Sequence, residues 1–415
     1  SGSLAELVAQ LEDINSREPQ REIHHAMAEL AYLAAKRSEP LNNDAALEYY
    51  GTALMHAYRY LFDNEAAPAN PYDPQFRGAS DLYNQSLEGM LRIVRTQGEL
   101  QPGSIRTIET ANHTCQLEVV VHANGWHNDD FERFEFVSDY RVEGLRNHYR
   151  SFGLGVPLIA IRRKHDGEDV AEQFYPSNLA FPITAFLKVS SPEGDVAPPR
   201  FVLELYNPLE QQSIDIAGSA IPLESDLSTP LAYFLSQPEL AETDIGTLGL
   251  LFPERVEQLQ GLYMLEPFQP EKMPVVMVHG LWSSPLTWME MFNDLRSDPM
   301  VREHYQFWFY LYPTGQPFWV SAARMREDLA LLRRQVDPAG RHAALDQTVL
   351  IGHSMGGLVS KLQSVESGDA FWQTMSDRPF AELSADEQLR KELAHTFFFE
   401  PNASIRRVVT IGTPH

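Results

Sequence analysis

Apolar and small residues recur with helical spacing through the first hundred positions of the chain. The spacing predicts four helices, at residues 4–14, 25–36, 45–62 and 79–94. Asn43 and Asp44 stand directly before the third helix and predict its N-terminal cap. Because no clean repeat period is present, we expect a small helical bundle packed on the rest of the chain, with binding of a partner protein by this region as the weaker alternative.

From about residue 104 to residue 236 the pattern changes to short runs rich in β-branched and aromatic residues. These runs predict strands at residues 117–121, 131–137, 156–161, 183–189 and 201–206. They indicate either a β-rich second domain or an extension of the sheet formed further along the chain. No catalytic pattern stands out in this region.

In the last third of the chain, strands alternate with amphipathic helices. Strands are predicted at residues 275–278, 306–312, 348–351 and 405–412, and helices at 287–296, 322–336 and 357–362. The aromatic strand 306–312 is expected to be buried on both faces, and Thr287 is expected to cap the first helix. This alternation predicts a parallel α/β sheet. The chain therefore divides into a helical region, 1–103, a β-rich region, 104–245, and an α/β region, 246–415.

The most informative motif is Gly352-His353-Ser354-Met355-Gly356. It indicates a nucleophile elbow, in which a buried strand leads into a sharp turn with serine at its tip and then into a helix. Gly352 and Gly356 permit close backbone approach at positions where a Cβ would clash. A β-branched strand precedes the motif and a helical pattern follows it, so Ser354 is the predicted nucleophile.

A second motif, His279-Gly280-Leu281-Trp282, ends the earlier apolar strand. Acyl transfer needs backbone N–H donors aimed at the developing oxyanion. The predicted donors are the N–H of Met355, after the nucleophile, and the N–H of Leu281. Gly280 lets the backbone turn into that position, His279 is expected to support the loop, and Trp282 is expected to line the substrate pocket.

These two motifs and Gly412-Thr413-Pro414-His415 make residues from about 273 to 415 resemble the α/β-hydrolase fold, in its bacterial lipase and esterase branch. The resemblance implies a serine nucleophile, an oxyanion hole of two backbone N–H groups and no cofactor. It covers the last third of the chain and does not specify the substrate.

The resemblance also implies a general base that the sequence does not identify. In this family the triad runs in the order Ser, then Asp or Glu, then His, and the last two follow later strands. His279, His353 and His415 are poor substitutes, because each belongs to one of the turn motifs. An apolar strand 405–412 at the end of a chain would also leave a bare sheet edge. We therefore expect the catalytic acid and histidine to lie beyond residue 415 in a longer gene product.

Residues 364–404 form an insertion between the nucleophile helix and the last strand. The insertion carries Phe371, Trp372 and three phenylalanines at 397–399. Excursions at the carboxyl edge of the sheet in this family often cover the active site, so we expect a cap-like segment. The alternative is that these aromatic residues pack the insertion onto the helices beneath it.

Composition narrows the functional classes. The formal charge of −24 argues against binding to nucleic acid and against electrostatic binding to anionic lipid. No apolar run reaches the ~20 residues that a membrane helix needs. Ser1-Gly2-Ser3 is typical of a tag scar or a processed end. The compartment, bacterial cytoplasm or cell envelope, therefore stays open.

Cys115 is the one cysteine, so no disulfide can form within the chain. His113, His122 and His127 lie near it in sequence, but their spacing does not match compact zinc motifs, and we expect no metal site.

The sequence thus predicts a serine hydrolase of carboxylic esters, acting on lipid or other hydrophobic acyl esters through an acyl-enzyme at Ser354. One alternative is an amidase or thioesterase with the same nucleophile. Another, from a different class, is a non-catalytic scaffold or binding protein built on a hydrolase fold.

Overall fold

The structure, a computed structural model, describes residues 4–17, 20–62, 73–98, 100–109, 114–165, 170–190, 200–216, 218–237 and 259–414. Contacts between Cα atoms group the chain into two compact units. Unit 1 comprises residues 1–141, 148–163 and 180–230, and unit 2 comprises residues 142–147, 164–179 and 231–415. The expected helical region and most of the expected β-rich region therefore lie in unit 1, whereas residues 142–147, 164–179 and 231–245 belong to unit 2. Both units are discontinuous in sequence.

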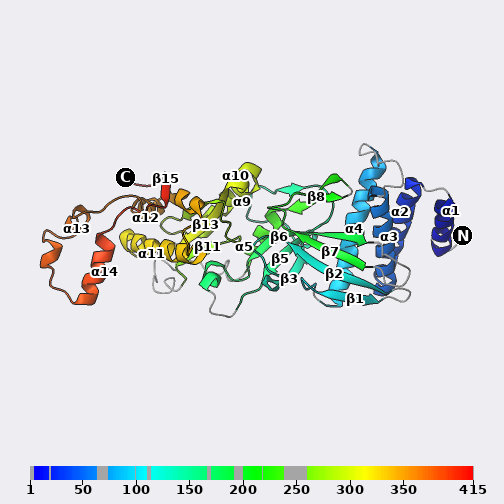
Figure 1. Ribbon diagram of the computed structural model, residues 1–415, viewed down its shortest axis with the longest axis horizontal. Coiled ribbons are helices and arrows are strands. Elements are labelled where there is room, and N and C mark those ends of the chain that lie inside the picture. Colours follow the sequence, from blue (N-terminus) through cyan, green and yellow to red (C-terminus); the bar gives the residue numbers. More distant parts are fainter. Residues whose placement is uncertain are drawn as a thin grey trace. The chain divides into compact units, whose positions relative to one another are not determined.

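Unit 1 begins with the four predicted helices, each longer than its sequence pattern (Figure 1). They are α1 Leu4–Arg17, α2 Arg21–Ser38, α3 Asn43–Phe62 and α4 Pro74–Thr96. The predicted cap of α3 is off by one residue, because Asn42 Oδ1 accepts the backbone N–H groups of Asp44 and Ala45 at 3.0 and 3.2 Å. Asn43 is already the first helical residue.

The sheet of unit 1 has six strands in the order β1-β2-β7-β6-β5-β3. The strands are β1 Ile105–Glu109, β2 Thr114–His122, β3 Phe131–Phe136, β5 Val156–Arg162, β6 Ala180–Ser190 and β7 Arg200–Tyr206. β2 and β7 are parallel, and the other neighbours are antiparallel. Two small ribbons pair β4 Arg150–Ser151 with β10 Ser225–Asp226 and β8 Ser213–Ile216 with β9 Ser219–Pro222. The predicted strands are confirmed, and they form a separate sheet rather than an extension of the sheet in unit 2.

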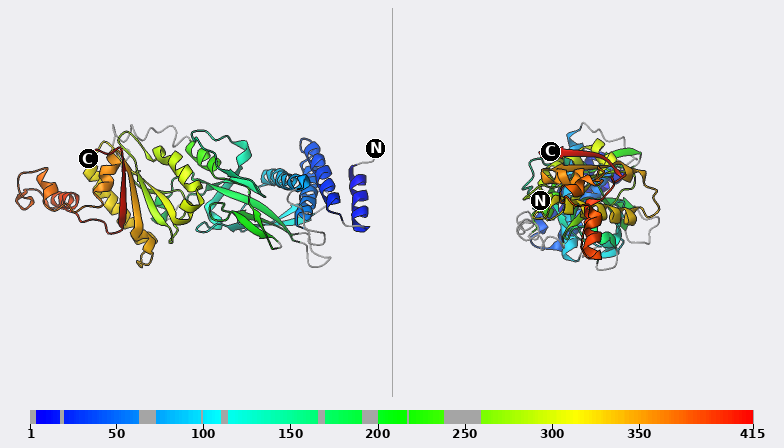
Figure 2. Two further views of the ribbon diagram at one scale, coloured as in Figure 1. Left: turned by 90° about the horizontal axis from the view of Figure 1, so that it is seen from above. Right: turned by 90° about the vertical axis from the view of Figure 1, so that its left-hand side faces the viewer.

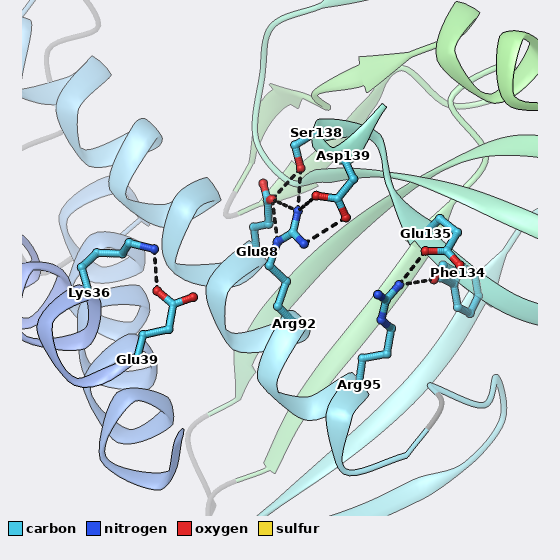
Figure 3. A network of polar contacts seen from close by, with 9 residues as sticks. All are labelled: Lys36, Glu39, Glu88, Arg92, Arg95, Phe134, Glu135, Ser138 and Asp139. Carbon is cyan, nitrogen blue, oxygen red and sulfur yellow. Dashed lines mark hydrogen bonds and ion pairs between the residues drawn. The ribbon is translucent and has the colours of Figure 1, made fainter. Parts of the chain in front are cut away.

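Helix α4 is attached to the sheet of unit 1 by ion pairs and by one buried tyrosine. Arg92 contacts Glu88 and Asp139, and Arg95 contacts Glu135, as Figure 3 shows. Tyr83, fully buried, donates its hydroxyl to Leu187 O at 2.7 Å and accepts the Leu187 N–H at 2.9 Å. Tyr83 thus joins α4 to β6 where β5 no longer pairs with that strand, and Arg95 joins α4 to β3.

Unit 2 contains a five-stranded sheet in the order β11-β13-β12-β14-β15. The strands are β11 Gly261–Met264, β12 Met273–Val278, β13 Tyr305–Leu311, β14 Thr348–His353 and β15 Ile405–Ile411. β11 is antiparallel to β13, and the other neighbours are parallel, as predicted for this region. β13 is buried at every position after its first residue, which confirms burial on both faces.

Helices pack on both faces of this sheet. The helices in the described part of unit 2 are α9 Met289–Ser297, α10 Pro299–His304, α11 Phe318–Val336, α12 Met355–Lys361, α13 Ala370–Gln373 and α14 Glu387–Phe397. The residues of α5 Ser228–Leu235 are divided between the two units. On one face α11 and α12 pack on Val276, Trp308 and Leu350. On the other face Phe292 of α9 contacts Phe307 and Phe309.

The predicted cap at Thr287 is wrong. A short 3₁₀ helix, Pro285–Trp288, precedes α9 and includes Thr287. Ser284 caps it, accepting the Leu286 N–H at 3.3 Å. Pro285, suited to the first helical position, starts the turn earlier than the apolar pattern indicates.

The insertion 364–404 lies at the opposite edge of the sheet from the one expected. The Asn402 N–H donates to Gln363 O at 2.8 Å, and Ile405 at the start of β15 pairs with Thr348 at the start of β14. Both ends of the insertion are therefore at the amino ends of the parallel strands, whereas Ser354 follows the carboxyl end of β14. In Figure 2 the orange helices of the insertion project away from the sheet.

The alternative interpretation of the insertion, packing on the helices, has direct contacts. His395 of α14 pairs with Glu327 of α11 at 3.1 Å, and the Arg326 guanidinium lies 4.1 Å from the ring centre of Phe399. Trp372 and Phe397 are buried and contact each other edge to face. Phe399 thus packs the insertion on α11, whereas Trp372 and Phe397 belong to a core within the insertion.

Candidate active site

Ser354 occupies the turn between β14 and α12 in a conformation that side chains rarely adopt. Its φ is +51° and its ψ is −121°. Such a backbone costs about 1–3 kcal/mol and persists only where the surroundings hold it. The Ser354 N–H donates to Ile411 O of β15 at 2.9 Å, and Ser354 O accepts the Gly357 N–H at 3.0 Å. The predicted strand, turn and helix are confirmed.

The elbow's glycines are fixed by close backbone approach. A Cβ on Gly356 would lie 2.3 Å from both His279 O and Val278 O. A Cβ on Gly352 would lie 2.5 Å from Gly356 O. Because these neighbours are backbone atoms, no side-chain movement could relieve the clash. Glycine at 352 thus permits the close packing of α12 on β14, and glycine at 356 permits the close packing of α12 on the end of β12.

The two motifs predicted from sequence meet at Gly280. A Cβ on Gly280 would lie 3.0 Å from Ser354 Cβ and 2.8 Å from His353 Nδ1. The parallel register explains the meeting, since Val278 pairs with Gly352 and both strands end at the same sheet edge. The loop after β12 therefore begins beside the nucleophile turn.

The residues on either side of this junction lie at the protein surface or near it. Leu281 is 46% exposed, and Trp282 is 69% exposed with a positive φ of +52°. Trp282 is therefore a surface side chain two residues after Gly280. Met355 is half-buried at the first position of α12, where a backbone N–H has no acceptor within the helix.

His279 is fully buried, and both of its ring nitrogens have contacts. Nδ1 lies 3.0 Å from Gly280 O, and the Tyr312 N–H approaches Nε2 at 3.4 Å. Burial lowers the pKa of His279 to about 4, so the ring is neutral at physiological pH. A ring with both nitrogens occupied cannot serve as a base for Ser354, and the expected supporting role fits better.

Sequence reasoning missed Tyr312, the buried residue that follows β13. Its hydroxyl donates to His279 O at 2.7 Å, and its ring stacks on the His279 ring with centres 4.4 Å apart. The aromatic run 306–312 signalled a buried strand. It gave no signal that this tyrosine contacts the loop after β12.

No residue in the part of the chain that the structure describes forms a hydrogen bond with Ser354 Oγ. His353 is exposed, and its ring lies between Gly280 and Gly412. His415 is outside the described residues. The described site thus contains the serine turn and the loop beside it, without a base in contact.

Metal-ligating side chains do not gather anywhere in the described part of the chain. Its residues include no group of three or more His, Cys, Asp and Glu side chains placed to hold a metal ion.

Among the residues that the structure describes, no helix has the length and apolar character to span a lipid bilayer. Burial raises the pKa of Cys115, which disfavours its thiolate.

Comparison with protein families adds an independent observation. Residues 275–403 match the model of the Alpha/beta hydrolase family. The match supports the alpha/beta hydrolase superfamily and a hydrolase fold for the segment that contains Gly280 and Ser354. It covers less than a third of the chain. Searches among curated proteins and among solved structures gave no match.

Proposed function

We propose that the protein is a serine hydrolase of carboxylic esters that forms an acyl-enzyme on Ser354. The observation that carries this proposal is the strained, positive-φ turn of Ser354 against Gly280. Strain of this kind is retained at functional sites, where it holds a side chain in a position that relaxed backbone would not give it. The family match over the same segment supports hydrolase chemistry.

In the proposed reaction, Ser354 Oγ attacks the ester carbonyl while a general base takes its proton. The Leu281 and Met355 N–H groups stabilise the negative charge on the carbonyl oxygen. The alcohol leaves with that proton, and water then releases the acid from the acyl-enzyme. Gly280, which precedes Leu281, lies beside Ser354. Met355 follows the serine, and this arrangement supports one donor from each side.

The surroundings of the serine favour hydrophobic acyl esters as substrates. Leu281, Trp282 and Leu286 are large apolar side chains that are 46%, 69% and 37% exposed. All three belong to the segment between Gly280, beside Ser354, and the start of α9. Apolar side chains on this segment are suited to an acyl chain, which gains about 0.8 kcal/mol for each CH₂ removed from water.

Hydrolysis of a nitrophenyl ester series tests this function. We expect measurable turnover that increases with acyl length, and loss of at least ~10³-fold on Ser354→Ala because the nucleophile is gone. Ser364→Ala is the matched control, since Ser364 is exposed just after α12 and should retain full activity. Equal rates for the wild type and Ser354→Ala would contradict the proposal. Aryl amide and thioester substrates in the same assay would detect an amidase or thioesterase.

One observation favours a second candidate function. Among the described residues, no general base contacts Ser354. A non-catalytic protein built on a hydrolase fold would have a serine in this state. Such a scaffold or partner-binding protein would be indifferent to Ser354→Ala in every assay, including binding of its partner.

A further inference from the structure

Tyr312 connects the end of β13 to the loop that carries the proposed oxyanion donor. It is 1% exposed, and its hydroxyl donates to His279 O at 2.7 Å. The same carbonyl oxygen lies against Gly356 of the elbow, where an added Cβ would be only 2.3 Å away. The His279 carbonyl is thus held between the Tyr312 hydroxyl and the first turn of α12.

The ring of His279 also restrains the next peptide, between Gly280 and Leu281. Its Nε2 accepts the Tyr312 N–H, so in the neutral ring the proton resides on Nδ1. Nδ1–H then donates to Gly280 O at 3.0 Å. Stacking of the Tyr312 and His279 rings, inclined by 21°, fixes the orientation of the imidazole that makes this bond.

The peptide between Gly280 and Leu281 is consequently fixed in its plane. The structure has no cis peptide among the residues it describes, and in a trans peptide the C=O and N–H point in opposite directions. With Gly280 O turned toward His279, the Leu281 N–H points away from the buried ring. That N–H is one of the two donors in the proposed reaction.

We propose that Tyr312 is a positioning residue for the oxyanion hole, acting through His279 on the Gly280–Leu281 peptide. This inference rests on the proposed serine hydrolase function. Tyr312 does not touch the substrate. Its hydroxyl and ring fix the position of His279. The His279 ring in turn fixes the Gly280–Leu281 peptide, which carries the donor N–H.

Tyr312→Phe tests the proposal because it removes the hydroxyl and keeps the ring. Complete removal of one oxyanion donor costs about 10²–10³ in rate, and a displaced donor should cost less, so we expect kcat to fall ~10–100-fold with KM unchanged. Tyr310→Phe is the matched control. Tyr310 is also buried, stacks on Tyr312 at 5.8 Å, and donates its hydroxyl to Ser321 O, away from the loop.

A thionoester substrate gives a readout that loss of stability cannot change. Sulfur is a longer and weaker acceptor than oxygen, so an oxyanion hole favours the oxygen ester over its thiono analogue. The ratio of the two rates does not depend on the folded fraction, because both substrates meet the same active molecules. We expect this ratio to fall by at least about 5-fold in Tyr312→Phe, as a weakened donor implies, and to stay at the wild-type value in Tyr310→Phe.

The outcomes separate this inference from the function on which it rests. An unchanged ratio and kcat in Tyr312→Phe, with hydrolysis that still depends on Ser354, would overturn the positioning role and leave the hydrolase standing. A ratio that falls equally in Tyr310→Phe would also overturn it, because the effect would then come from core packing. Hydrolysis unaffected by Ser354→Ala would overturn the proposed function itself.

Discussion

Gly356 lies with its Cα against two backbone carbonyls, those of Val278 and His279. Gly356→Ala would bring a Cβ to 2.3 Å from both oxygens, so the elbow or the loop after β12 must move. We expect ester hydrolysis to fall at least ~100-fold and stability to fall by about 1–3 kcal/mol. Rates together with urea unfolding check both effects.

Gly51→Ala is the contrasting substitution. Gly51 is within α3, and nothing lies within 4 Å of the Cβ that alanine would add. Alanine there should stabilise the helix by about 0.5–1 kcal/mol and leave activity unchanged. A Gly356→Ala protein with wild-type activity would show that the elbow does not need the close approach seen here.

For single residues, the sequence predicted the local structure correctly where the residues belong to a short local motif. The strand, turn and helix around Ser354 and the glycine at 280 follow from short patterns. Tyr312 could not be found in this way, because its partner is 33 residues away on a neighbouring parallel strand. No spacing rule links two such positions before the register is known.

Between α2 and α3, two buried histidines form a contact that needs neutral rings. His24 Nδ1 and His56 Nδ1 are 3.0 Å apart, and Asn15 Nδ2 lies 3.3 Å from His24 Nε2. Burial is the main cause that lowers the pKa of His56 to about 3, and the proximity of His24 and Arg59 lowers it further. The unfolded chain binds a proton near pH ~6.5, so this contribution to stability is present above that pH and is lost as the pH falls toward 3.

We therefore expect α3 to lose protection from amide hydrogen exchange on acidification. The His56 contribution amounts to about 2 kcal/mol between roughly pH 7.5 and pH 5. His56→Gln should lose less protection over this range than the wild type. His304→Gln, at an exposed histidine of unit 2, should behave like the wild type. Equal pH dependence in all three proteins would contradict the neutral pair.

Helices and strands were predictable as elements because their apolar spacing is local. Their ends were less so, since Asn42 rather than Asn43 caps α3, and Pro285 starts a 3₁₀ turn before α9. The predicted position of the insertion, over the active site, was wrong for a topological reason. A segment between the end of α12 and the start of β15 begins and ends at the amino edge of a parallel sheet, whatever aromatic residues it carries.

At the scale of the whole molecule, the units are assembled from segments distant in sequence. Phe174 is 5% exposed in the core of unit 2, with Leu262 and Met264, although the chain between them contributes mainly to unit 1. Phe174→Ala should destabilise unit 2 by about 3–5 kcal/mol. Hydrogen exchange in β11 and β13 measures this. Phe152→Ala, at a side chain that is 84% exposed, should have almost no effect.

Sequence patterns do not predict unit boundaries of this kind. The change from helical to β-rich pattern near residue 104 is real, yet α4 is joined to the sheet of unit 1 through Arg92, Arg95 and Tyr83. A change of secondary structure marks a new element, whereas a unit boundary depends on which residues pack together. Protection in β11 and β13 that is unaffected by Phe174→Ala would contradict the assignment of that segment to unit 2.

The proposed function requires Ser354 to be an activated nucleophile, and reaction with a fluorophosphonate probe measures that activation. The serine oxygen displaces fluoride from phosphorus, and peptide mass spectrometry locates the adduct. We expect an adduct on the peptide containing Ser354 that is absent in Ser354→Ala and present in Ser364→Ala. No adduct at Ser354, or an equal signal in Ser354→Ala, would contradict it.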